Sequence, residues 1–307
     1  MTAALHLKKI RELDLEQPSA PGRPSYISAA SGLVTVRSWQ YVVADDELHL
    51  GVFPVQATQP GRLFRLFEGE LPADKGDRKK VKPDLEALVL LPSFASFTHG
   101  ALFAIGSGSK RNRRQGVLLR LDEHGAIHGK PRAIDLTQLF DAVEQHVIDL
   151  NIEGAVVLRE RFVLIQRGNK GGGLNALVTM NLHDVLAQLE AKDAIAAVPF
   201  DVRTYDLGAI DGIPLCFTDG AALPDERIVF SAVAEDTDNS YSDGPCAGAA
   251  IGILGPEGHL QSLQRLTPGA KVEGVAAHVE NGRIHLLLVT DADDAKIPAS
   301  MYAAEIG

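Results

Sequence analysis

Hydrophobic and polar positions repeat five times along the chain, at intervals of 54 to 67 residues. Each repeat opens with one polar residue followed by two small or apolar residues, and a short β-prone segment continues from there. The five openings are Ser31-Gly32-Leu33, Glu86-Ala87-Leu88, Glu153-Gly154-Ala155, Asp219-Gly220-Ala221 and Glu273-Gly274-Val275. Because the same pattern recurs across most of the chain, it indicates a structural repeat.

Further β-prone segments follow each opening in the same order. The second segments are largely apolar and cover residues 41–43, 102–105, 162–165, 228–230 and 284–289. After a polar loop, the third segments cover residues 48–55, 116–121, 174–181, 248–254 and 300–306. A fourth segment follows in the first four repeats, whereas the fifth repeat has three.

Units of four strands cannot bury both faces alone, so this repeat favours radial stacking. The sequence therefore predicts an all-β protein, a single β-propeller domain over residues 1–307 with five four-stranded blades. Six blades is the alternative. The β-like segment 5–13 belongs to no repeat, and we expect this N-terminal strand to complete the last blade and close the ring.

Four connecting stretches lack the β pattern. Apolar residues at helical spacing predict surface helices over 136–146 and 182–191, with Asn181 as the N-cap of the second. Proline and glycine clusters predict loops over 17–24 and 71–82, which extend from one rim of the propeller.

Charge and composition narrow the choice of partners. A net charge of −10 opposes attraction to phosphate backbones, so no nucleic-acid partner is expected. No apolar run approaches the roughly 20 residues of a membrane helix, and no membrane association is expected. The first residues show no apolar signal core, which favours a cytoplasmic location. The two cysteines, Cys216 and Cys246, are too few for a disulfide framework and fit a reduced compartment.

The polar residues that open the repeats should meet at the propeller axis, because the first strand of each blade lines the central channel. The predicted ring consists of Ser31, Glu86, Glu153, Asp219 and Glu273. Crowded carboxylates resist ionisation unless a cation or bound protons compensate them. Oxygen ligands alone select a hard cation, and a flexible ring suits Ca²⁺ better than Mg²⁺. The alternative is that these residues accept backbone hydrogen bonds and hold neighbouring blades together.

The loops after the second segments should surround one mouth of the channel. Two of these loops are basic and glycine-rich, a composition suited to binding phosphate or carboxylate, and the alternative is a solvated charged rim. The predicted anion-binding residues are Lys110, Arg111, Arg113, Arg167 and Lys170. The other loops are acidic and supply candidate bases for activating water. The candidate catalytic residues are Asp45, Asp236 and Asp291.

Two family resemblances follow from these residues. The five repeat openings and the loop 106–114 resemble the five-bladed calcium-activated nucleotidase (apyrase) family. This resemblance implies a central Ca²⁺ held by the opening residues and a phosphate contact from Arg167 or Lys110, although Asp219 stands where that family has a hydroxyl. Separately, residues 151–155 and 166–169 resemble bacterial propellers of unassigned function, grouped with phytase-like or esterase-like domains, and this implies no particular activity.

Together these features predict a Ca²⁺-dependent hydrolase that acts on a phosphate-containing or similar anionic small molecule at the channel mouth. The alternative is a non-enzymatic propeller that binds a ligand or a protein partner, in which the acidic ring serves folding alone.

Overall fold

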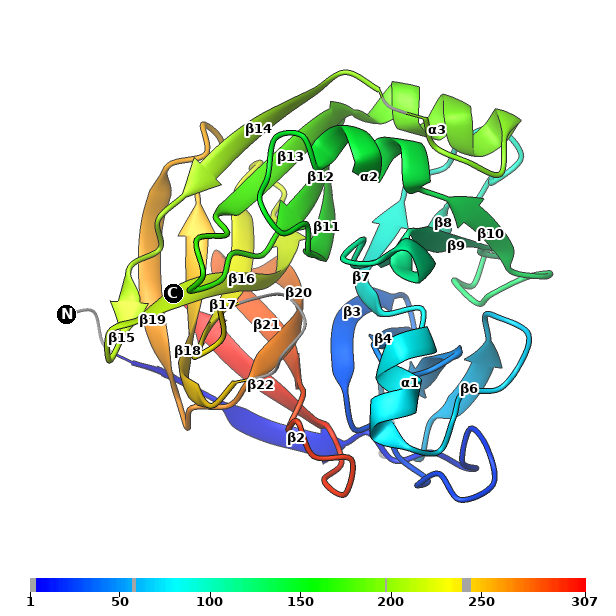
Figure 1. Ribbon diagram of the computed structural model, residues 1–307, viewed down its shortest axis with the longest axis horizontal. Coiled ribbons are helices and arrows are strands. Elements are labelled where there is room, and N and C mark those ends of the chain that lie inside the picture. Colours follow the sequence, from blue (N-terminus) through cyan, green and yellow to red (C-terminus); the bar gives the residue numbers. More distant parts are fainter. Residues whose placement is uncertain (1–3, 57–58, 197, 239–243) are drawn as a thin grey trace.

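The computed structural model describes residues 4–307 except 57–58, 197 and 239–243. Five antiparallel sheets stand radially around a central axis, which confirms the predicted five-bladed propeller (Figure 1). Blade 1 contains β3 (Ala30–Val36), β4 (Trp39–Ala44), β5 (His49–Pro54) and β6 (Arg62–Arg65). Blade 2 contains β7 (Leu85–Leu91), β8 (Ala101–Gly106), β9 (Gln115–Arg120) and β10 (Arg132–Asp135). Blade 3 contains β11 (Ile152–Leu158), β12 (Arg161–Gln166), β13 (Asn175–Asn181) and β14 (Phe200–Tyr205).

The N-terminal segment joins the last two blades and closes the ring, as expected. Blade 4 contains β16 (Ile213–Ala222), β17 (Ile228–Glu235), β18 (Cys246–Leu254) and β19 (Leu260–Thr267), with the short β15 (Ala209–Ile210) on β16 and β1 (Leu5–His6) parallel to β19. Blade 5 contains β20 (Val272–Glu280), β21 (Arg283–Thr290), β22 (Ser300–Ile306) and β2 (Lys8–Glu12). The last of these strands pairs antiparallel with β22.

Apolar packing between the blades explains why the ring must close. Five clusters of buried apolar side chains lie among the described residues, one between each pair of neighbouring blades. Phe103 of blade 2 and Phe162 of blade 3, with ring centroids 6.5 Å apart, show how β-strand side chains from two blades share one core. A missing blade would leave two such surfaces in water.

The helices decorate the connections between strands. The predicted helix over 182–191 is α3 (Leu182–Ala191), and the Asn181 side chain accepts a hydrogen bond from the His183 backbone N–H at 2.9 Å. The helix predicted over 136–146 is shorter and corresponds to α2 (Thr137–Val143). A 3₁₀ turn covers Arg111–Arg113. No helix in the described part of the chain is long and apolar enough to cross a bilayer.

The prediction of a loop over 71–82 was wrong, because α1 (Lys75–Val81) lies within this stretch. A helix of seven residues is marginal by itself, so its sequence gives little signal. A local cap and a tertiary contact stabilise it: the Asp74 side chain accepts a hydrogen bond from the Asp77 backbone N–H, and buried Arg78 pairs with Asp46 at 3.2 Å. Figure 1 shows α1 in front of blade 1, near the central channel.

Every innermost strand carries a β-bulge, which lies near the start of the strand in four blades and in the middle of β16 in blade 4. The strand pairing shifts between Ala30 and Gly32, Leu85 and Ala87, Ile152 and Gly154, Phe217 and Asp219, and Val272 and Gly274. Such bulges redirect a side chain out of the regular ladder. The bulged residues are Ser31, Glu86, Glu153, Thr218 and Glu273, so the structure places Thr218 rather than Asp219 at the common register in blade 4.

Candidate functional site

A pocket of about 1110 Å³, counting the part open to solvent, occupies the channel mouth on the side of the β-bulges. Loops of all five blades and α1 contribute to its wall. Its lining is dominated by charge, with ten carboxylates and seven basic side chains, and the described lining residues include no aromatic side chain. The pocket is therefore built for a polar or charged ligand rather than for an apolar one.

Four of the five predicted ring residues line this pocket: Ser31, Glu86, Glu153 and Glu273. The Thr218 hydroxyl, at the fifth position, bonds to Ser231 Oγ at 2.8 Å and donates to the Val272 carbonyl at 2.7 Å, so it links blades 4 and 5.

Asp219 does not line the pocket, contrary to the prediction that it belongs to the ring. Its Oδ2 accepts a hydrogen bond from the Val275 backbone N–H in the next blade at 2.8 Å, and burial raises the pKa of its carboxyl well above the usual value. Asp219 thus fits the alternative interpretation, in which an opening residue accepts a backbone hydrogen bond and holds two neighbouring blades together.

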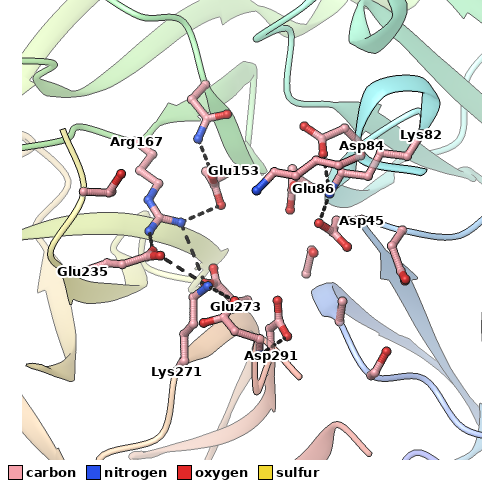
Figure 2. Close-up of a pocket in the computed structure, with 18 of the residues that line it drawn as sticks. Asp45, Lys82, Asp84, Glu86, Glu153, Arg167, Glu235, Lys271, Glu273 and Asp291 are labelled. Carbon is pink, nitrogen blue, oxygen red and sulfur yellow. Dashed lines mark hydrogen bonds and ion pairs between the residues drawn. The ribbon is translucent and has the colours of Figure 1, made fainter. Parts of the chain in front are cut away.

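One side of the pocket contains the Arg167 cluster, which comprises Arg167, Lys271, Glu153, Glu235 and Glu273 (Figure 2). The Arg167 guanidinium pairs with Glu235, and lies 3.4 Å from Glu153 Oε2 and 3.8 Å from Glu273 Oε1. The Lys271 ammonium lies 3.4 Å from Glu273 Oε1 and 3.8 Å from Glu235 Oε2. These carboxylates come from blades 3, 4 and 5, so the two cations join three blades.

Burial dominates the protonation of this cluster. It raises the pKa of Glu153 to about 8 despite the nearby Arg167, and it raises the pKa of Glu273 although Lys271 and Arg167 oppose this. Burial works against the charge of Arg167, yet Glu153 and Glu273 raise the pKa of its guanidinium well above the usual value. The cluster thus holds permanent cations beside carboxyl groups that bind protons readily.

The other side contains Asp45, Asp84, Glu86 and Lys82 (Figure 2). Together with Arg113, which pairs with Asp84, these residues form the Asp84 cluster. The Lys82 ammonium pairs with Asp45 and lies 2.8 Å from Asp84 Oδ1, while Arg113 donates to Asp84 Oδ2 at 2.7 Å. Glu86 has no hydrogen-bond or ion-pair partner among the residues that the structure describes. Burial, and then the nearby Glu153 and Asp84, raise the pKa of the Glu86 carboxyl well above its usual value.

The Asp84 cluster also supplies the best donor set for a metal ion. One carboxylate oxygen each from Asp45, Asp84 and Glu86 lie within 4.8 Å of one another, and the described residues contain no other such group of three. Oxygen-only donors fit a hard cation such as Ca²⁺ or Mg²⁺. The axial carboxylates Glu153 and Glu273 differ, because Arg167 and Lys271 already supply positive charge beside them.

The predicted anion-binding residues divide into two groups. Arg113 and Arg167 line the pocket, but both are paired with carboxylates. Lys110, Arg111 and Lys170 do not line it: Arg111 is exposed, and Lys170 pairs with Asp236 at 2.7 Å outside the pocket.

Among the candidate catalytic residues, Asp45 and Asp291 line the pocket and Asp236 does not. Asp291 interacts electrostatically with Lys271 of one cluster and Asp45 of the other. Its Oδ1 accepts a hydrogen bond from the Asp293 backbone N–H at 2.7 Å, and burial raises the pKa of its carboxyl well above the usual value.

Several pocket residues escaped prediction. Asp84, Asn151 and Lys271 each precede a bulged glutamate by two positions, and all three line the pocket. Alternate residues of a strand share a face, so this spacing was a usable signal. The four basic side chains that α1 and its end bring to the mouth gave no such signal, because the helix itself was not predicted. They are Lys75, Arg78, Lys79 and Lys82.

Comparison with known protein families identifies the family of this chain. Residues 26–306 match the family model described as a family of unknown function (DUF6929). The chain belongs to this family. No curated protein matches it. The resemblance to propellers of unassigned function is therefore confirmed, whereas no specific match supports the resemblance to the calcium-activated nucleotidases.

Solved structures similar to this DUF6929 protein share its fold at low sequence identity. An arabinoxylan arabinofuranohydrolase of glycoside hydrolase family 43 from Bacillus subtilis is 10% identical, with a TM-score of 0.50 over 95% of this chain and 66% of that chain. Glutaminyl cyclase from Myxococcus xanthus is 11% identical, with a TM-score of 0.48 over 99% and 100% of the two chains. These likenesses concern architecture and carry no activity with them.

Proposed function

We propose that this protein is a metal-dependent hydrolase of a small anionic molecule, with Asp45, Asp84 and Glu86 as the metal ligands. The observation that carries the proposal is the surplus of carboxylate at one side of the pocket: Glu86 has no partner in the described chain, yet its oxygen lies within 4.8 Å of ligand oxygens of Asp45 and Asp84. A divalent cation would offset this repulsion, which burial makes costly.

The residues around the donor set suit an anionic substrate. A hard cation there would supply a Lewis acid for a phosphoryl or carboxylate oxygen and would lower the pKa of a bound water. Lys75 and Lys79 of α1 line the same pocket, and their positive charge attracts an anion into it. Asp291, which lines the pocket and interacts electrostatically with Asp45, is the candidate base for the attacking water.

The competing function is a non-enzymatic propeller that binds a ligand at the same mouth. One observation favours it: Arg113 and Arg167, the two predicted anion-binding residues that line the pocket, are both ion-paired with carboxylates. An anion would have to displace these carboxylates or rely on the metal and the α1 lysines. The two functions therefore differ in turnover rather than in location.

Release of phosphate or alcohol from nucleotides, phytate and a panel of aryl phosphates and esters, with Ca²⁺, Mg²⁺, Mn²⁺ or EDTA, tests the proposal. We expect turnover that requires a divalent cation and falls at least about 100-fold in Glu86→Ala, because the variant loses a metal ligand. Glu160→Ala, which removes an exposed glutamate of blade 3, is the matched control and should keep wild-type turnover. Absence of turnover with every substrate and metal would favour the ligand-binding propeller.

A further inference from the structure

Lys82 lies between the two aspartates of the Asp84 cluster, just past the end of α1. Its ammonium pairs with Asp45 Oδ2 and lies 2.8 Å from Asp84 Oδ1, and its side chain is 8% exposed. Burial opposes this charge, but Asp45 and Asp84 raise the pKa of Lys82 above its usual value. The cluster therefore already contains a cation, and that cation belongs to the protein.

The two carboxylate oxygens of Asp84 have different partners. Oδ2 accepts hydrogen bonds from Arg113 Nη1 at 2.7 Å and from Ser107 Oγ at 2.5 Å, which hold the carboxylate in place. Oδ1 pairs with Lys82. Departure of the ammonium would thus leave Asp84 correctly oriented, with Oδ1 available beside Glu86.

Two hydrogen bonds hold the backbone of Lys82 in place. Its N–H donates to the Arg78 carbonyl at 2.8 Å, and its own carbonyl accepts from Asn112 Nδ2 at 3.0 Å. The helix is anchored in turn by Arg78, which pairs with Asp46. Movement of the ammonium therefore requires only rotation of a four-carbon side chain.

Glu273, on the opposite side of the same pocket, also has hydrogen-bonding capacity that the described residues leave open. This residue lines the pocket and is 4% exposed, and neither of its carboxylate oxygens accepts a hydrogen bond in the described part of the chain. Ion pairs with Lys271 at 3.4 Å and Arg167 at 3.8 Å balance its charge, but buried carboxylates normally also accept hydrogen bonds, so this one can still take a donor from a ligand in the pocket.

We propose that Lys82 and a divalent cation compete for Asp45 and Asp84, so that Lys82 sets the metal affinity of the pocket. This inference rests on the metal site of the proposed function but not on hydrolysis. A divalent ion carries twice the charge of the ammonium and can bind Glu86 as well, so it displaces Lys82 at sufficient concentration. When the ion leaves, Lys82 returns and again neutralises the two aspartates.

Calorimetric titration of the full-length protein with CaCl₂ tests this competition. Lys82→Met is expected to bind Ca²⁺ about tenfold or more tighter than the wild type, because the resident cation no longer competes. Lys82→Arg, which keeps the charge, should bind Ca²⁺ as weakly as the wild type. Lys79→Met removes one charge from the same helix at the pocket wall, and its Ca²⁺ affinity should stay within about threefold of the wild-type value.

Three outcomes separate this inference from the hydrolase proposal. Equal or weaker Ca²⁺ binding by Lys82→Met, in protein whose thermal melt shows that it is folded, overturns the competition and leaves the metal site standing. An equal gain in affinity in Lys79→Met also overturns it, because the effect would then be long-range charge alone. Tighter binding confined to Lys82→Met without any hydrolysis supports the competition and overturns only the enzymatic activity.

Discussion

The two sides of the pocket contain similar residues but balance their charges differently. In the Arg167 cluster, two cations lie among three glutamates that come from three blades, and the guanidinium reaches all of these carboxylates. In the Asp84 cluster, the cations pair with the two aspartates and the nearby Glu86 has no partner in the described chain. One side is joined across the blades, whereas the other contains a carboxyl group, Glu86, with no partner in the described chain.

This difference separates a structural role from a ligand-binding one. Removing one member of a buried, shared ion pair leaves its partners charged without compensation, so the Arg167 cluster should stabilise the ring. An unpaired carboxylate contributes nothing of this kind, and burying it costs free energy. The Asp84 cluster is therefore the side at which a ligand, rather than the protein alone, completes the charge balance.

The largest expected effect is on the Arg167 side. Arg167→Met should lower the free energy of unfolding by about 3–5 kcal/mol, because it leaves Glu153, Glu235 and Glu273 buried without their common cation. Urea denaturation followed by tryptophan fluorescence and circular dichroism measures the change. Arg159→Met is the control: this side chain is 72% exposed and pairs with Glu226, so the loss should stay below about 1 kcal/mol. If both variants lose the same free energy of unfolding, the Arg167 cluster has no special structural role.

An intermediate and opposite effect is expected on the Asp84 side. Without metal, Glu86→Gln should be as stable as the wild type or slightly more stable, because it removes a half-buried carboxyl group that has no partner among the described residues. At a Ca²⁺ concentration 100 times the dissociation constant, the wild type should gain about 2.7 kcal/mol and Glu86→Gln should gain almost nothing. Thermal unfolding with CaCl₂ and with EDTA measures both quantities. If Glu86→Gln is destabilised without metal, or if Ca²⁺ still stabilises it as much as the wild type, then the two sides of the pocket do not differ in the way described.

The smallest effect concerns pH. Burial raises the pKa of Glu153 to about 8, so between about pH 5 and 8 the folded protein holds a proton that the unfolded chain has lost. Stability should consequently fall as the pH rises through this window, and Glu153→Gln should flatten the fall by roughly 1–2 kcal/mol between pH 6 and 8. Urea midpoints at several pH values measure it, with the exposed Glu160→Gln as control. If the slopes of the wild type and Glu153→Gln coincide, Glu153 is not the group responsible.

Much of the fold was predictable from the sequence because every blade repeats the same order of β-strands behind a polar opening residue. The polar residue that opens each repeat coincides with a β-bulge in four of the five blades, so this pattern located four of the five bulged residues. In blade 4 the adjacent Thr218 and Asp219 are both polar, and only strand pairing shows which of them bulges. The helix α1 was missed for another reason, since its stability depends on contacts far away in the chain.

The balance of charge within the pocket was not predictable. Spacing along the strands indicated that carboxylates would meet at the axis, and the need for compensating charge suggested a metal ion there. Arg167 and Lys271 compensate the carboxylate charge because their long side chains point towards the axis. A repeat pattern does not indicate the direction of these side chains. As a result, the metal that the sequence suggested for the whole ring is proposed for one ring residue, Glu86, together with Asp45 and Asp84.

A crystal structure of the protein grown with MnCl₂, with an anomalous difference map, tests the central claim most directly. Mn²⁺ prefers the same oxygen ligands as the proposed ion. We expect one strong anomalous peak between Asp45, Asp84 and Glu86, with the Lys82 ammonium moved away from both aspartates. A peak on the axis between Glu153 and Glu273, or no peak with Lys82 still in place, would contradict the claim.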